Sequence, residues 1–367
     1  MIGRKWRSTL GGLLLALFTY PAISSSGQWV NPKEAIGDPW VARLQQGRKE
    51  LAPGEKEDLA RYGYTGLELM TYADYNSFTG EDYDNFWRIV HISPTRHIQI
   101  KLWVERGKHL FKHYRDLLTY NGLQPDSVIL KFRLIYFYPP AQWGWGVTNF
   151  TYLRSEEFDK KYPRKKTEAW RWLPDQRKVS RGSNNDRADH FQGTEMTQDD
   201  FRWRRPWAED HRILGEDTFE GKRCLVVESV HHDATYYLSK RVTWIEMEHF
   251  LDLHEEQFDK KGQPLKVIGR RWRQYQPWGY WAREEWDGYN LQTQARTLLQ
   301  KYDWLYDQGL SEEFFRGREM RKEYHWRSPR RDAIPPIRSL SDLAPVPEIR
   351  TAFWDRLGIK LSLKGKD

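Results

Sequence analysis

The chain has 367 residues and a formal net charge of +8, and its charged residues, 30% of the total, are mixed in sign, which argues against a nucleic-acid-binding protein. Its single cysteine, Cys224, excludes an intramolecular disulfide, and we expect it to be a small buried hydrophobic side chain. Aromatic residues make up 15% of the chain, which fits either cross-strand pairs in a large β-sheet or an aromatic-lined groove for a lipid or a glycan.

The N-terminus has the three parts of a secretory signal. Basic residues (Arg4, Lys5 and Arg7) precede an apolar run, Leu10–Tyr20, that is short for a membrane span, and small residues follow from Ala22. We therefore predict a signal peptide over residues 1–27, with an uncleaved N-terminal anchor as the alternative. Its removal would lower the formal charge from +8 to about +5, because these residues contain no acid. Export with only one cysteine favours the bacterial periplasm.

Residues 28–90 have the least regular pattern, with short helices predicted within 32–51 and 54–69. Two strands follow, 86–92 and 97–104, and the second alternates between apolar and polar residues. Residues 108–120 have apolar side chains at helical spacing and end at Asn121-Gly122, so we predict a helix that covers the sheet.

The middle of the chain reads as strands separated by turns. We predict strands over 126–138 and 145–153, and a strand in two halves over 168–180, interrupted at Pro174-Asp175. The polar residues 182–200 are expected to be an excursion on the surface.

The stretch from Lys222 to Val267 organises the rest of the sequence. Its turns recur about every 12–15 residues, which is typical of an antiparallel meander, and residues 208–220 lead into it. Further strands are predicted over 264–275, 280–286 and 290–302, although the last has helical propensity. We predict one domain over residues 28–326, followed by a Pro- and Arg-rich tail, 327–367, with a short helix within 347–357.

No motif in the sequence predicts catalysis, a cofactor or a metal. His231-His232 and the cluster from His249 to Glu256 lack metal-site spacing, and neither a Gly-x-Ser-x-Gly elbow nor a phosphate loop is present. Carboxylate pairs leave a glycosidase open, because the acid and base of such enzymes come from distant positions. These pairs are Glu156-Glu157, Glu246/Glu248 and Glu284-Glu285.

Several segments in order resemble the outer-membrane lipoprotein-sorting-like proteins, relatives of LolA and LolB. The segments are Phe137–Leu153, Glu168–Gly182, His211–Glu228, Tyr236–Val267, Asn290–Leu299 and Gly309–Phe315. The stretch from Ser183 to Arg205 departs from the family's spacing. The resemblance implies a mainly β fold: a strongly curved antiparallel sheet, or half-open barrel, whose open side is plugged by helices. It also implies an apolar concave face that receives lipids, and an association with lipid-exporting transporters of the resistance-nodulation-division type.

The apolar faces of the predicted strands supply the candidate cavity, although an ordinary core under the 108–120 helix would show the same pattern. The candidate lining residues are Ile98, Ile100, Leu102, Val104, Leu130, Phe132, Leu134 and Trp244. Arg177, Lys178 and Arg181 are candidates for contacts with lipid headgroups or a partner. We therefore expect a non-enzymatic periplasmic carrier for a lipid, a lipoprotein or another hydrophobic molecule, working with a membrane transporter. The alternatives are a glycan-active envelope enzyme and a structural envelope interaction protein.

Overall fold

The computed structural model describes residues 29–37, 50–111, 114, 127–152, 167–181, 188–201, 205–322, 326–327, 337 and 339–361. The predicted signal peptide lies outside these residues. Within the described ranges, no helix combines the length and hydropathy that a membrane crossing requires.

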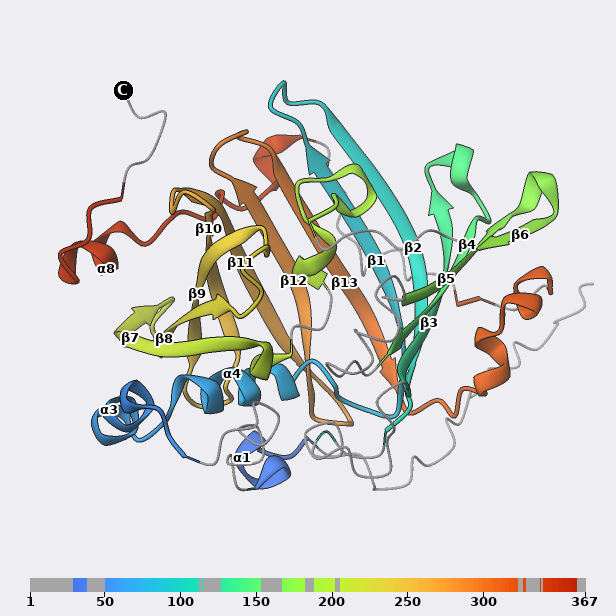
Figure 1. Ribbon diagram of the computed structural model, residues 1–367. Helices are drawn as coiled ribbons and strands as arrows, with labels where there is room; N and C mark the ends of the chain where they lie inside the picture. The colour runs from blue at the N-terminus through green and yellow to red at the C-terminus, as the bar shows by residue number, and fades with distance from the viewer. Residues whose placement is uncertain are drawn as a thin grey trace, which may run out of the picture.

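The described strands form one 13-stranded antiparallel sheet (Figure 1). Its order is β6-β5-β4-β3-β2-β1-β13-β12-β11-β10-β9-β8-β7. The strands are β1 (Asp82–Ile92), β2 (Ile98–His109), β3 (Val128–Tyr138), β4 (Gly146–Tyr152), β5 (Thr167–Leu173), β6 (Lys178–Arg181), β7 (Glu209–Phe219), β8 (Lys222–His231), β9 (Leu238–Glu246), β10 (Asp252–Asp259), β11 (Pro264–Tyr275), β12 (Tyr280–Asn290) and β13 (Arg296–Tyr306).

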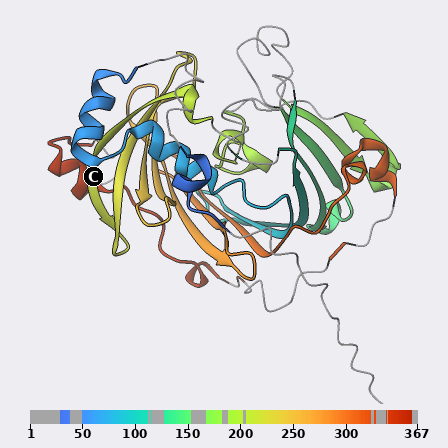
Figure 2. The same ribbon diagram turned by 90° about the horizontal axis from the view of Figure 1, so that it is seen from below.

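This order consists of two meanders that meet in the middle of the sheet. β1 to β6 run outward to one edge, and β7 to β13 return from the other edge until β13 pairs with β1. Among the described residues the edge strands β6 and β7 are not paired with each other, and the sheet curls into an open trough (Figure 2). The predicted half-open antiparallel fold is confirmed.

The predicted strands are largely confirmed, including the ambiguous one. Residues 290–302 form a turn and then β13, because the Asn290 side chain accepts hydrogen bonds from the backbone N–H groups of Gln292 and Thr293 and closes the turn. Pro174 begins a short 3₁₀ helix that separates β5 from β6, as its interruption of the strand pattern predicted.

Helices cover part of the concave face. α3 (Pro53–Tyr62) and α4 (Gly66–Tyr75) replace the single predicted helix over 54–69, and α1 (Pro32–Ile36) packs beside α4. The start of α4 is fixed by Thr65 and Glu68, which cap each other's backbone N–H groups. Gly66 allows close packing, because a Cβ there would lie 2.8 Å from the Cβ of His211 on β7.

A second element on the concave face corrects the prediction of a surface excursion over 182–200. In its described part, residues 188–201, Met196 is fully buried, and Phe191 and Phe201 pack with the tryptophans of the sheet. Asp200, in helix α7 (Gln198–Phe201), forms a buried ion pair of 2.7 Å with Lys266 on β11. The physical reason is topological: the chain between β6 and β7 must pass from one edge of the sheet to the other, and it does so across the trough (Figure 2). We call residues 188–201 the plug.

The predicted start of the covering helix over 108–120 is wrong, because Lys108 and His109 belong to β2. Phe111 and Tyr114 pack with α4, and the rest of that prediction lies outside the described residues.

The convex face is covered by the C-terminal segment. α8 (Thr351–Arg356) places Phe353 and Trp354 in a cluster with Val226, Val242, Trp244 and Phe258. Cys224 belongs to the same cluster and is fully buried, as predicted, and burial raises the pKa of its thiol to about 12.

The short 3₁₀ helices are η1 (Pro140–Gln142), η2 (Pro174–Gln176), η3 (Phe191–Gly193), η4 (Pro206–Ala208), η5 (Glu312–Phe315), η6 (Gly317–Arg321) and η7 (Leu340–Asp342).

Candidate functional site

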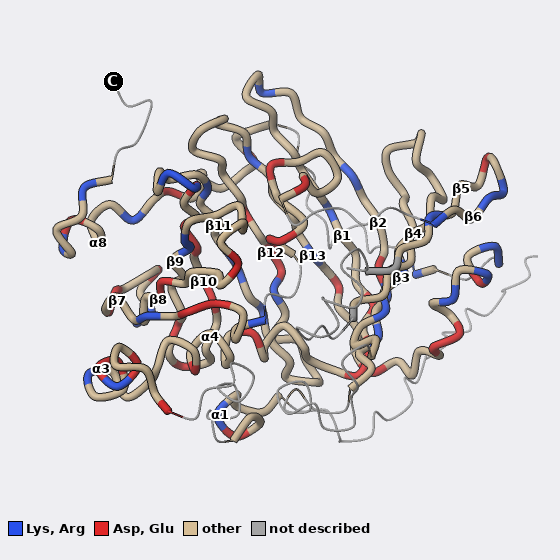
Figure 3. The backbone as a smooth tube through the Cα atoms, in the orientation of Figure 1, with Lys and Arg blue, Asp and Glu red and all other residues tan. Residues whose placement is uncertain are grey.

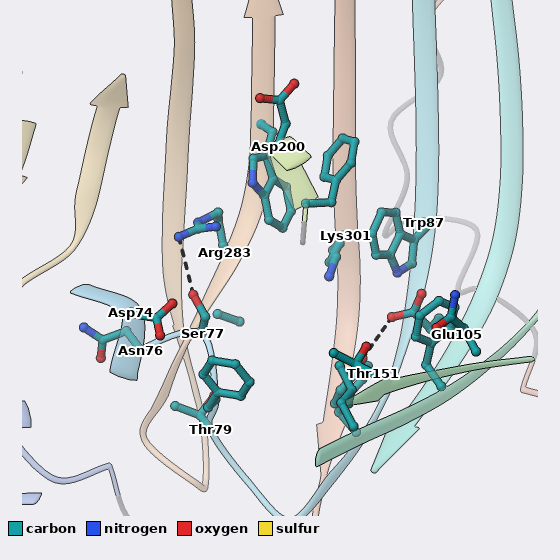
Figure 4. Close-up of a pocket in the computed structure, with 18 of the residues that line it drawn as sticks. Asp74, Asn76, Ser77, Thr79, Trp87, Glu105, Thr151, Asp200, Arg283 and Lys301 are labelled. Atoms are coloured by element: carbon teal, nitrogen blue, oxygen red, sulfur yellow. Dashed lines mark hydrogen bonds between the residues drawn. The ribbon is translucent and has the colours of Figure 1, made fainter. Parts of the chain in front are cut away.

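A cavity of about 440 Å³ lies on the concave face of the sheet. Its lining comes from the inward-facing side chains of β1 to β5 and β9 to β13, from α4 with the loop after it, and from the plug. Figure 4 shows side chains from both halves of the sheet pointing into it. This volume lies within the usual range for small-molecule sites, roughly 300–1,000 Å³.

Tryptophans of the four central strands form one wall of the cavity. Trp87 of β1 lies directly opposite Trp103 of β2, and their rings stack with centroids 5.1 Å apart. The ring of Trp286 on β12 lies nearly parallel to that of Trp87, with the ring centroids 6.4 Å apart. Trp304 of β13 also lines the cavity. The alternation of the strands brings these side chains to one face, because every second residue points inward.

The part of the cavity beside β9 to β12 contains paired charges. The guanidinium of Arg283 donates to both oxygens of Asp252, at 2.8 and 2.9 Å. Arg270 donates to Glu255 at 2.8 Å. These arginines are bound to carboxylates of the protein itself, as buried charges require.

The part beside β1, β2 and β13 contains Lys301 and Glu105. The Lys301 Nζ lies 4.0 Å from the ring centroid of Trp87 and 5.1 Å from those of Trp286 and Trp304. Burial lowers the pKa of Lys301 to about 8, although the charge of Glu105 opposes this shift. Burial likewise raises the pKa of the Glu105 carboxyl.

A close approach between strands positions the partner of Glu105. The Tyr83 hydroxyl donates to Glu105 at 3.1 Å. This requires the Tyr83 ring to lie across β2 at Gly107, where a Cβ would come within 2.1 Å of the ring. Gly107 is therefore part of the site's architecture.

The predicted lining residues fall on both faces of the sheet. Leu130, Phe132 and Leu134 line the cavity, whereas Ile98, Ile100, Leu102 and Val104 do not. Ile98 and Ile100 pack beneath the C-terminal segment with Ile337 and Leu343, so the apolar stripe of β2 faces outward. Trp244 also faces outward, where its indole N–H donates to Asp217 at 2.9 Å. On β2 the residues that line the cavity are Trp103, Glu105 and His109, from the face opposite the apolar stripe.

The predicted basic contacts do not belong to the lining of this cavity. Arg177, Lys178 and Arg181 are exposed at the β5–β6 hairpin and do not line it, and Figure 3 shows basic positions at that hairpin. Their role with a headgroup or partner stays a prediction.

Among the described residues of the acidic clusters considered for metal binding or catalysis, only Asp252 lines the cavity, where it pairs with Arg283. Ligand atoms of Glu246, Glu248 and His249 lie within 4.8 Å of one another, but Glu246 caps the β9–β10 turn by accepting the backbone N–H of His249 at 3.1 Å. Glu284 pairs with Arg273, and Glu285 with Arg271, and neither glutamate lines the cavity. Glu156-Glu157 lies outside the described residues.

Comparisons with known proteins point to one fold. A family model described as "uncharacterized protein" matches residues 148–322, and no curated protein sequence matches the chain. Two crystal structures are similar over 70% of this chain, each with a TM-score of 0.56. One is a domain from Vibrio parahaemolyticus assigned to outer membrane lipoprotein sorting, 20% identical and covered over 98% of its length. The other is a DUF1329 family protein from Desulfovibrio piger, 19% identical and covered over 97%. The chain therefore has the half-open β-sheet fold of the outer-membrane lipoprotein-sorting-like proteins, as its sequence resemblance predicted.

Proposed function

We propose that this protein is an exported, periplasmic carrier that binds a lipid or another hydrophobic molecule in its concave cavity, without catalysing a reaction on it. The observation that carries the proposal is the tryptophan-lined cavity of about 440 Å³ in the trough of the sheet. A cavity with an aromatic wall removes apolar ligand surface from water, and its few polar groups orient the ligand. An inner-membrane transporter of the resistance-nodulation-division type, or an outer-membrane protein, is the expected partner.

The fold supports this proposal, since one structural relative is assigned to outer membrane lipoprotein sorting. The paired arginines of the cavity also favour binding over hydrolysis. Asp252, for example, accepts hydrogen bonds from Arg283 with both oxygens, so its charge is already paired.

The test is to purify the protein from its host and examine it by native mass spectrometry and organic-solvent extraction. We expect co-purifying lipid, and displacement of a fluorescent acyl-chain probe by the extract. Ala169→Trp, which places a large ring at a lining position, should abolish probe binding. Leu357→Trp, at an exposed position in the C-terminal segment, should not.

Absence of both lipid and probe binding would refute the carrier function. Hydrolysis of a cell-wall or capsular glycan would instead promote the enzyme alternative. Crosslinks to envelope proteins that depend on the C-terminal tail would promote the structural alternative.

A further inference from the structure

In the described lining of the cavity, more hydrogen-bond donors than acceptors are left without a partner. Each acidic side chain in the lining has a donor within the protein: Asp74 from Tyr114, Glu105 from Tyr83, Asp199 from Tyr236, Asp200 from Lys266 and Asp252 from Arg283. The carboxylates of the described lining are thus paired before any ligand enters.

Several donors in the same lining have no acceptor. The indole N–H groups of Trp87, Trp103, Trp281, Trp286 and Trp304 are buried, and none forms a hydrogen bond to a described residue. Buried polar groups in proteins are almost always hydrogen-bonded, so a cluster of exceptions in one place requires an explanation. A bound molecule that carries hydrogen-bond acceptors would pair with these indole N–H groups.

Lys301 is the charged member of this donor-rich region. Its ammonium group is surrounded by the faces of Trp87, Trp286 and Trp304, and no hydrogen bond or ion pair joins it to a residue that the structure describes. Arg241, Arg270 and Arg283, from the other part of the lining, all have carboxylate partners. Figure 4 shows the ends of Lys301 and Trp87 pointing to the side of the cavity where Glu105 lies.

We propose that Lys301 and the tryptophans around it bind the anionic head group of an amphiphilic ligand, a carboxylate or a phosphate, while the remaining aromatic wall holds its hydrocarbon chain. The inference rests on the proposed carrier function and names the class of cargo. Three ammonium donors with no acceptor match an anion of this kind, and charge-assisted hydrogen bonds are the strongest available to such a group.

The experiment compares ligands that share one chain and differ only at the head: palmitate, hexadecyl phosphate and hexadecanol. Binding is followed by quenching of tryptophan fluorescence below the aggregation concentration of each ligand. We expect wild type to bind one or both anions about 10- to 100-fold more tightly than the alcohol, the range that a hydrogen bond to a charged group provides. The two anions distinguish a carboxylate site from a phosphate site.

Lys301→Met should reduce that ratio to about one and leave hexadecanol affinity unchanged, while Lys301→Arg should retain a preference for anions. Lys222→Met is the matched control, because it removes an exposed lysine at the β7–β8 turn. Thermal melting of each variant shows that it is folded.

Equal affinity of wild type for the anions and the alcohol, or an unchanged ratio in Lys301→Met, would overturn the head-group assignment but leave the carrier function standing. No binding of any of the three ligands would refute the carrier function itself.

Discussion

The tryptophans on the two faces of the curved sheet differ in the hydrogen bonds of their indole N–H groups. On the convex face, Trp244 donates its indole N–H to Asp217 at 2.9 Å, and Trp354 donates to Glu256 at 2.6 Å. On the concave face, Trp87, Trp103 and Trp286 are also buried, but their N–H groups have no acceptor among the described residues. A polar group paired within the protein contributes to stability, whereas an unpaired one costs stability and is available to a ligand.

The two faces also differ at one charged group each. Although burial raises the pKa of the Asp217 carboxyl, hydrogen bonds from Trp244, Arg356 and Arg350 outweigh that effect and hold its pKa below the ordinary value. On the concave face, burial dominates at Lys301 and lowers its pKa to about 8. The convex face is therefore a completed interface with the C-terminal segment, and the concave face is incomplete by itself.

The largest expected effect comes from disrupting the packing between the C-terminal segment and the convex face. Trp354→Ala should lower the free energy of unfolding by about 3–5 kcal/mol, because it empties a buried site in the cluster around Trp244. Urea denaturation measures the change, and Leu357→Ala, at a position that is 39% exposed, is the control. Since the cavity lies on the opposite face, ligand affinity measured where the variant is folded should not change. A loss of less than about 1 kcal/mol would show that the C-terminal segment is not part of the stable core.

The second test measures how much stability the protein loses by burying the charge of Lys301 on the concave face. Lys301→Met should stabilise the protein near neutral pH by up to about 3 kcal/mol, because it removes a desolvated cation whose pKa falls from 10.5 to about 8. Glu105 and Arg283 are the charged groups that act on it. A melting temperature lower than that of wild type would contradict an incomplete site and would indicate a structural role for Lys301.

The pH dependence has a defined sign. Between about pH 8 and 10.5 the unfolded chain holds the Lys301 proton more tightly than the folded protein does, so this residue's contribution makes wild-type stability rise with pH across that interval. The difference in melting temperature between wild type and Lys301→Met should therefore shrink as pH rises. Anion binding by wild type should weaken over the same interval, because the ammonium group loses its charge.

The smallest expected effect is at Gly107. Gly107→Ala places a Cβ within 2.1 Å of the Tyr83 ring, so the ring must move and the hydrogen bond to Glu105 is disturbed. We expect a loss of about 1–3 kcal/mol in stability and a weaker preference for anionic ligands. Gly54→Ala is the control, since a Cβ there meets no atom within 4 Å and the residue lies in helix α3. Gly107→Ala with wild-type stability and binding would show that the position of Tyr83 does not matter.

Local sequence patterns were enough to predict most strands and turns, and the resemblance to the outer-membrane lipoprotein-sorting-like proteins predicted the half-open fold. The signals for the strands and turns were local: the alternation in β2, the proline at the β5–β6 turn, and the regular turns from Lys222 to Val267. Local backbone preferences and strand period are properties of neighbouring residues, so they can be read without knowing the rest of the chain.

Which face of each strand lines the cavity became clear from the folded chain. The apolar stripe of β2 predicts an inward-facing side, but Ile98 and Ile100 pack from outside against Ile337 and Leu343 of the C-terminal segment. Trp103 faces inward, where Phe191 of the plug packs against it, and Glu105 lines the same cavity. Binary patterning identifies a buried face without saying what buries it. A sheet covered on both sides has two such faces, and the distant segments that distinguish them meet only when the chain is folded.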